Sequence, residues 1–219
     1  MALRQSVYIR VAALWGLFVG GLAWGADGVA PGVLAPGEAE ALQAIRTAAA
    51  EVRTVCCDFS ETKTIALLSK PVVSEGRLFF ARPACLRWEV LRPVESGFAT
   101  DGAQVMRWHQ RTGKSERVQN ESLPILQEVC ANIMTWITAD LDAIRRQYDV
   151  RILGTAPVTL ELRPLRQDAK AFIATVTVRF AQGGTQVEAV TLREPGGDTT
   201  EIAFRNVEFN RELDRALFR

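Results

Sequence analysis

Most of the chain alternates between apolar and polar residues, the pattern of half-buried β-strands. The alternation begins at Thr54, after which Val55, Cys57, Phe59 and Glu61 share one face. Further strand-like runs follow between Pro- and Gly-containing turns, near 71–81, 86–92, 96–100, 104–110 and 115–120. Turns about every ten residues are typical of an antiparallel meander, in which strands adjacent in sequence also pair.

A helical period replaces the alternation at the start of this region. Leu42, Ile45, Ala49 and Val52 recur on one face and predict an amphipathic helix over about 38–52.

A second helical stretch interrupts the strands. Apolar residues from Leu123 to Ile144 keep helical spacing and predict a central helical insert, in which Thr138 or Asp140 can cap a second short helix. Strand-like runs then resume near 150–152, 158–162, 172–180, 185–193 and 199–209.

About ten or eleven strands with so few helices predict a mainly β (α+β) fold and exclude a parallel Rossmann sheet. We expect an unclosed antiparallel β-barrel, with the N-terminal helix and the central helical insert lying across it as a lid. If the helices pack loosely, the concave apolar face is a cavity for an apolar ligand. If they pack tightly, it is only a core.

The N-terminus has the pattern of an export signal. Arg4 and Arg10 precede an apolar run over 11–23, and small residues follow, so we expect a signal peptide over 1–25 with cleavage after Gly25. The run is short for a transmembrane anchor, which is the alternative interpretation. Residues 26–37 are rich in Gly, Pro and Ala and predict a linker, which leaves one domain over 38–219.

Composition excludes several function classes. The 219 residues carry a formal net charge of +1 without a long basic run, which argues against nucleic acid as the partner. Motifs for serine hydrolases, zinc proteases, phosphate loops and dinucleotide binding are absent from the sequence, so we expect no enzyme and no cofactor. The single histidine, His109, and the adjacent Cys56-Cys57 pair also argue against a metal site and a catalytic thiol.

Several motifs together resemble the LolA family of periplasmic outer-membrane lipoprotein carrier proteins. In chain order they are Val55-x-x-x-Phe59-x-Glu61, Ser74-x-Gly76-x-Leu78-x-Phe80-x-Arg82-Pro83, Leu86-x-Trp88, Asp101-Gly102 and Phe204-x-Asn206-Val207-x-x-Asn210. The resemblance covers about 40–209 and is densest over 55–102. Two features depart from the family pattern: Glu61 stands where the family usually has Gln, and the cysteines Cys56, Cys57 and Cys85 are unusual for it.

The resemblance implies that acyl chains lie against the concave face. The residues that we expect to bind lipid are Leu42, Ile45, Phe59, Leu78, Phe80, Leu86, Trp88 and Val90. It also implies that Arg82 is the barrel arginine that bonds to backbone carbonyls of the lid and holds it closed. Alternation places Arg82 in the apolar interior, where a charge needs acceptors. The alternative is an arginine at the rim, facing water.

Export to an oxidising compartment permits disulfides, and four cysteines allow three pairings in two bonds. One hypothesis is a disulfide between Cys57 and Cys130 that ties the helical insert to the barrel and leaves Cys56 and Cys85 on the outer face.

We therefore expect a periplasmic, monomeric carrier that moves lipoproteins from the inner to the outer membrane. By resemblance, its partners are an inner-membrane ABC-type release complex and an outer-membrane acceptor lipoprotein. Two alternatives stay open: a carrier or accessory for another acylated envelope lipid, such as a glycolipid or polyene lipid, and an envelope assembly scaffold with a packed interior.

Overall fold

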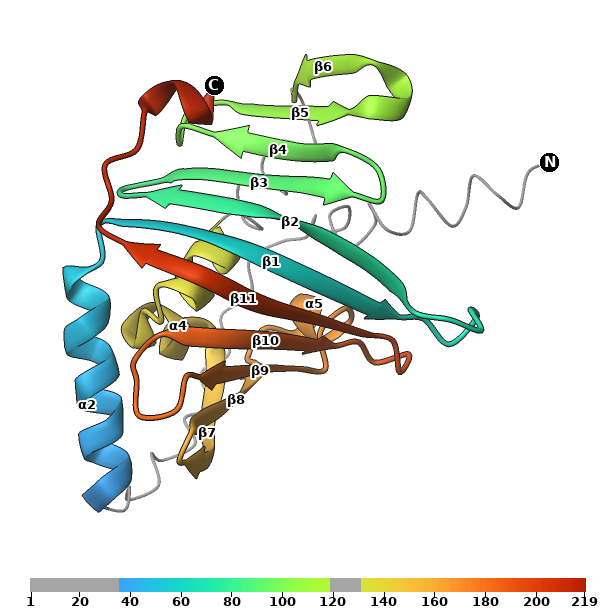
Figure 1. The fold of residues 1–219 in the computed structure, drawn as a ribbon. Coiled ribbons are helices and arrows are strands. Elements are labelled where there is room, and N and C mark those ends of the chain that lie inside the picture. Colours follow the sequence, from blue (N-terminus) through green and yellow to red (C-terminus); the bar gives the residue numbers. More distant parts are fainter. Residues whose placement is uncertain (1–35, 119–130) are drawn as a thin grey trace.

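The computed structural model describes residues 36–118 and 131–219, which form one eleven-stranded antiparallel sheet (Figure 1). The strands are β1 (Thr54–Thr64), β2 (Val72–Ala81), β3 (Cys85–Arg92), β4 (Ser96–Thr100), β5 (Val105–His109), β6 (Lys114–Arg117), β7 (Tyr148–Thr155), β8 (Val158–Pro164), β9 (Thr175–Phe180), β10 (Val187–Arg193) and β11 (Thr199–Phe209). Their order across the sheet is β6-β5-β4-β3-β2-β1-β11-β10-β9-β8-β7. Because β6 and β7 do not pair with each other, the barrel is unclosed, as predicted.

The sheet consists of two meanders joined at their ends. Strands β1 to β6 pair in sequence order, and so do β7 to β11. The two halves meet where β1 pairs with β11, with Phe59 opposite Phe204. The predicted meander is therefore confirmed, and the one non-local pairing brings the first and last strands together at the centre of the sheet.

The N-terminal helix, α2, spans Pro36–Glu51 and begins two residues before the predicted start. Proline suits the first helical position because the N–H that it lacks has no partner within the helix there. The prediction that Pro36 and Gly37 belong to a linker is therefore wrong. The predicted signal peptide and the rest of the predicted linker lie outside the described residues.

The central insert is helical over 131–137 and again in α4 (Leu141–Gln147). Asp140 is the cap, because its Oδ1 accepts a hydrogen bond from the Ala143 N–H at 3.0 Å. Thr138 instead donates from its hydroxyl to the Met134 carbonyl at 2.8 Å. A further short helix, α5 (Gln167–Lys170), lies between β8 and β9 and was not predicted. None of the helices in the described ranges has the length and apolar character that crossing a bilayer requires.

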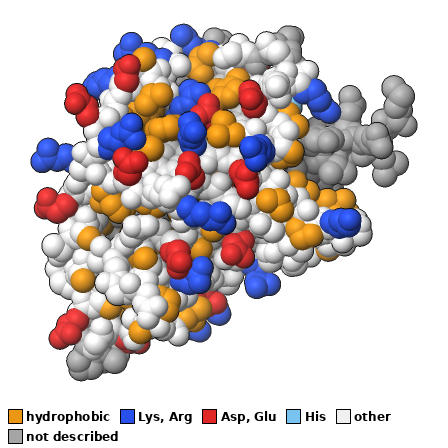
Figure 2. Space-filling model, viewed as in Figure 1, with side chains coloured by type: hydrophobic (Ala, Val, Ile, Leu, Met, Phe, Trp, Pro, Cys, Tyr) orange, Lys and Arg blue, Asp and Glu red, His pale blue; other side chains and the backbone are white. Residues whose placement is uncertain are grey.

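In the view of Figure 1, the helices of the central insert and α5 lie behind β11 and β10, and α2 lies beside the sheet at the left. Leu42 and Ile45 of α2 and Leu141 and Ile144 of α4 are buried in the same hydrophobic cluster as the inward-facing side chains of the strands. The opposite, outer face carries interspersed basic, acidic and apolar side chains (Figure 2). The sequence alternation thus separates an apolar concave face from a mixed outer face.

The chain ends in a short 3-10 helix, η2 (Arg215–Phe218), which contacts β3 and β4. Phe218 is buried there, outside the main cluster. Arg87 donates to the Leu217 carbonyl at 3.3 Å and lies 4.4 Å from the centre of the Trp108 ring. These contacts hold the C-terminus against the sheet.

Candidate lipid-binding site and helix clamp

The apolar side chains predicted to bind lipid converge on the concave face of β1, β2 and β3. Leu78 lies opposite Trp88, and Phe80 lies opposite Leu86, across the β2–β3 pair. Phe59 reaches the same surface from β1, with its ring centre 4.1 Å from that of Trp88. All five side chains are at most 5% exposed.

The helical side completes this surface. Leu42 and Ile45 of α2 belong to the same cluster, and Val90 packs at its margin, partly buried. The structure therefore brings together all eight residues that were expected to bind lipid. Helices α2 and α4, which contribute to this cluster, contact each other and β7.

Gly76 belongs to the motif that resembles the LolA family, but it is not among the residues that were expected to bind lipid. It lies opposite Phe59 on β2. A Cβ atom at this position would lie 2.5 Å from Phe59 Cζ and 2.0 Å from the Glu89 carbonyl oxygen. Glycine is thus needed here because the aromatic ring occupies the space that a side chain would fill.

Arg82 clamps the C-terminal end of α2. Its Nε donates to the Val52 carbonyl at 2.6 Å, and its Nη2 donates to the Ala49 carbonyl at 3.1 Å. The last turn of α2 contains no basic residue of its own. Arg82 therefore supplies, from the sheet, the positive charge that favours a helix C-terminus.

The predicted orientation of Arg82 into an apolar interior is wrong. Strand β2 ends at Ala81, so the alternation does not extend to Arg82, which lies exposed at the rim in the following turn. The bonded carbonyls belong to the N-terminal helix and the residue that follows it, rather than to the central insert.

Asn210 forms hydrogen bonds at the same end of α2. It belongs to the last sequence motif, for which no role was predicted. Its Nδ2 donates to the Glu51 carbonyl at 3.1 Å, and its Oδ1 accepts from the Arg53 N–H at 2.7 Å. Its left-handed backbone, with φ 59°, is a conformation that asparagine tolerates better than most residues. Residues from the ends of β2 and β11 thus fix the end of α2.

The two helical regions are also joined directly. Arg46 of α2 donates to Asp142 of α4 at 2.8 Å. Both side chains are exposed, so this pair adds little stability. It nevertheless makes α2 and α4 neighbours, so that fixing α2 also restrains α4.

A charged group lies on the concave face beyond the apolar residues, near the end of β1. Lys63 is only 5% exposed, and its Nζ lies 3.7 Å from Glu194 Oε1. Thr200, opposite Lys63 on β11, is equally buried. Burial raises the pKa of the neighbouring Glu61, and the Lys63 charge lowers it by a smaller amount. The sequence pattern does not predict this group, because its members are far apart in the sequence and become neighbours only where β1, β11 and β10 lie side by side.

Comparison with known proteins identifies the family. Residues 50–219 match the family described as outer membrane lipoprotein carrier protein LolA. The chain belongs to the LolA family. The predicted resemblance is therefore confirmed.

Two relatives carry the name outer-membrane lipoprotein carrier protein. The one from Dechloromonas aromatica is 24% identical over 170 residues, which cover 76% of this chain and 76% of that protein. The one from Chromobacterium violaceum is 25% identical over 196 residues, which cover 88% of this chain and 89% of that protein. An uncharacterized conserved protein from Thermus thermophilus has a similar fold, with a TM-score of 0.51, 10% identity, and coverage of 83% of this chain and 92% of that one.

The cysteines of this LolA-family chain do not form the predicted disulfides where the structure describes them. Cys56, Cys57 and Cys85 are free, and Cys130 lies outside the described residues. Cys56 and Cys85 lie on β1 and β3 with β2 between them, about 10 Å apart from strand spacing alone, whereas a disulfide needs less than about 7 Å between Cα atoms. Burial raises the pKa of the Cys57 thiol to about 12, which disfavours the reactive thiolate.

His109 has a structural role at the end of β5. Its Nδ1 accepts a hydrogen bond from the Arg111 N–H at 3.1 Å, which caps the 3-10 turn η1 (Gln110–Thr112).

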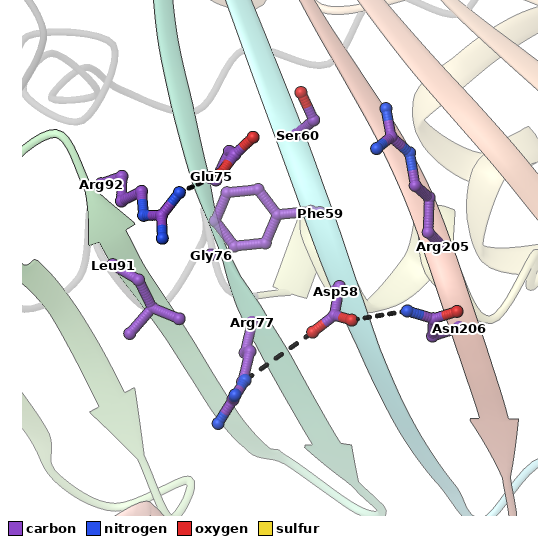
Figure 3. Close-up of a pocket in the computed structure, with 10 residues that line it drawn as sticks. All are labelled: Asp58, Phe59, Ser60, Glu75, Gly76, Arg77, Leu91, Arg92, Arg205 and Asn206. Atoms are coloured by element: carbon purple, nitrogen blue, oxygen red, sulfur yellow. Dashed lines mark hydrogen bonds and ion pairs between the residues drawn. The ribbon is translucent and has the colours of Figure 1, made fainter.

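The outer face has a hollow of about 330 Å³ over β1, β2 and β11 (Figure 3). Asp58 lines it, accepting from Asn206 at 2.8 Å and lying 3.7 Å from Arg77. Arg92 and Glu75, 3.8 Å apart, form another part of the wall. Charged walls of this kind suit acyl chains poorly, so in this LolA-family chain the concave face is the better candidate site.

Proposed function

We propose that this protein is a periplasmic carrier that binds the acyl chains of lipoproteins on its concave face and moves them from the inner to the outer membrane. The observation that carries the proposal is the continuous apolar surface between the sheet and helices that are clamped at one end. The family match and the names of the two relatives support the same conclusion.

Binding an acyl chain requires the helices to move away from the sheet. Leu42 and Ile45 share one buried cluster with Phe59, Leu78 and Leu86, so an entering chain has to replace part of this apolar packing. Each buried methylene contributes about 0.8 kcal/mol, or roughly 12 kcal/mol for a ~16-carbon chain. Exchanging one apolar contact for another leaves only part of this energy as net affinity, which allows a carrier to release its cargo.

Arg82 sets the energy difference between the closed and open states in this proposal. Moving α2 away breaks two hydrogen bonds from a charged group, each contributing about 1.5–3 kcal/mol. The clamp therefore favours the closed state until cargo or a partner compensates.

Location and partners follow from the same proposal. The N-terminal segment would direct export, with cleavage after Gly25. An inner-membrane ABC-type complex would supply the cargo, and an outer-membrane acceptor lipoprotein with higher affinity would receive it from the monomeric carrier.

Fluorescent acyl-chain binding tests the proposed surface. Leu86→Glu places a charge on the concave face and should weaken binding of a fluorescent palmitoyl probe at least tenfold. Leu91→Glu, on the outer face of the same strand, should leave binding unchanged. Val90→Glu, at the partly buried margin, serves as a second variant that disturbs the core less. Equal binding by all folded variants would contradict the site.

A second candidate function is the carriage of another acylated envelope lipid, such as a glycolipid or polyene lipid. The charged group around Lys63 favours it, because a distinct polar recognition element on the concave face suits a distinct headgroup. The same concave surface would hold the acyl part of either cargo.

A further inference from the structure

The polar group at the end of β1 lacks hydrogen-bond partners. Glu194 Oε1 and Thr200 Oγ1 are buried, and neither has a hydrogen-bond partner among the described residues. The Lys63 ammonium has three N–H donors and lies beside these atoms, with Nζ 3.7 Å from Glu194 Oε1, which is longer than a hydrogen bond. Buried polar groups are normally satisfied, so two unsatisfied atoms beside a buried lysine indicate a site that takes a polar ligand group or ordered water.

These groups share the concave face with the acyl-binding surface. Lys63 and Phe59 are both buried on β1, four residues and therefore about 13 Å apart along the strand. Cys57 and Val55 continue the same apolar face toward the clamped end of α2. The face is thus polar at one end and apolar along the rest, which matches a ligand with a polar head and a long apolar tail.

The charges and unused hydrogen-bonding groups of this site determine which kind of ligand head group it can bind. Lys63 is balanced by Glu194, so a charged head would leave one buried charge unpaired. A phosphate would also approach the carboxylates of Glu194 and Glu61. The unused groups include the N–H donors of Lys63 and the hydroxyl of Thr200, which together call for an uncharged acceptor such as a carbonyl oxygen.

We propose that Lys63 and Thr200 donate hydrogen bonds to the ester or amide carbonyl that links an acyl chain to its cargo, while Glu194 balances the Lys63 charge. This inference rests on the proposed carrier function and adds to it: the carrier recognises the acyl linkage as well as the chain.

The test compares two synthetic lipopeptides with two 16-carbon chains, one carrying palmitoyl esters and one carrying hexadecyl ethers, by competition against the fluorescent palmitoyl probe. The ether analogue has the same chains but lacks the ester carbonyls. The wild-type chain should bind the ester form about tenfold more tightly than the ether form.

Two variants should reduce this preference to within about twofold. Thr200→Val removes a hydroxyl that has no partner among the described residues, so it should not lower the free energy of unfolding. The double variant Lys63→Met/Glu194→Gln removes both charges together and avoids leaving one buried alone. Thr62→Val, one residue away on the opposite face of β1, is the matched control and should keep the preference.

The outcomes separate this inference from the proposed function. Strong and equal binding of both lipopeptides by the wild-type chain would overturn the linkage site while leaving the carrier function intact, and would assign the polar group to bound water. A preference that survives in both variants would also overturn it. Failure of the wild-type chain to bind either lipopeptide or the palmitoyl probe would contradict the proposed function itself.

Discussion

Gly76 shows how one residue shapes the concave face. The Phe59 ring lies where a side chain at this position would be, and the Glu89 carbonyl approaches even more closely. Gly76→Ala should therefore displace the ring or the backbone and lower the free energy of unfolding by about 1–3 kcal/mol, measured by urea denaturation. Gly196→Ala is the control, because a Cβ atom there meets nothing within 4 Å. Equal stability of the two variants would show that the close approach has no energetic consequence.

Glu61 makes stability depend on pH. Its pKa in the folded chain lies above the ordinary value of 4.5 because burial penalises the charged form. Such a group stabilises the fold when protonated, and this contribution is lost as the pH rises through the raised pKa. Glu61→Gln should therefore raise Tm at pH 8, and the gain should shrink toward zero near pH 4.

The control for this pH dependence is Glu201→Gln, on the exposed outer face of β11. It should show no comparable trend. A gain in Glu61→Gln that is the same at pH 4 and pH 8 would mean that ionisation of Glu61 is not its cause.

The sequence pattern predicted correctly which residues of a single strand are buried. It did not predict contacts between residues that are far apart in the sequence. Alternation correctly placed Leu78, Phe80 and Trp88 on one buried face. It misplaced Arg82, because the strand ends one residue earlier. It could not reveal the contact between Lys63 and Glu194, since that contact depends on three strands lying side by side.

At the scale of elements, the clamp on α2 is the feature most open to test. Arg82→Leu removes both bonds to the helix end, so the amides in the last turn of α2 should exchange with solvent about tenfold faster or more. Arg82→Lys keeps the charge but loses the fork of two N–H groups and should give an intermediate rate.

The matched control for Arg82 is Arg92→Leu, because Arg92 also precedes a proline but forms only an exposed ion pair with Glu75. Its effect on exchange in α2 should be negligible. If Arg82→Leu and Arg92→Leu gave the same exchange rates in α2, the clamp would have no role in holding the helix.

Most elements could be predicted because their periods are local. Both helical regions and the run of strands follow directly from alternating or helical spacing. The helix α5 has only four residues, too few for a period to show. The pairing of β1 with β11 joins the two ends of the domain, so nothing in the local pattern indicates it.

At the scale of the whole molecule, the unclosed sheet and the helices form a single core, which the proposed function also uses as a binding surface. A barrel closed by hydrogen bonds between its edges could not separate its walls. Among the residues that the structure describes, β6 and β7 are the two edges of one sheet, and the helices are attached to it through side-chain contacts and the Arg82 clamp. Moving the helices therefore leaves the strand pairing intact.

The most direct test is to identify what the protein carries. The mature protein would be purified from a bacterial periplasm, and its lipid content would be determined by mass spectrometry under denaturing conditions. The account predicts acylated lipoproteins in the preparation and their loss in Leu86→Glu. Arg82→Leu should keep them, because the bonds that it removes belong to the closed state. Absence of any bound lipid, together with no binding of a hydrophobic dye, would contradict it and show that the concave face is only a packed core.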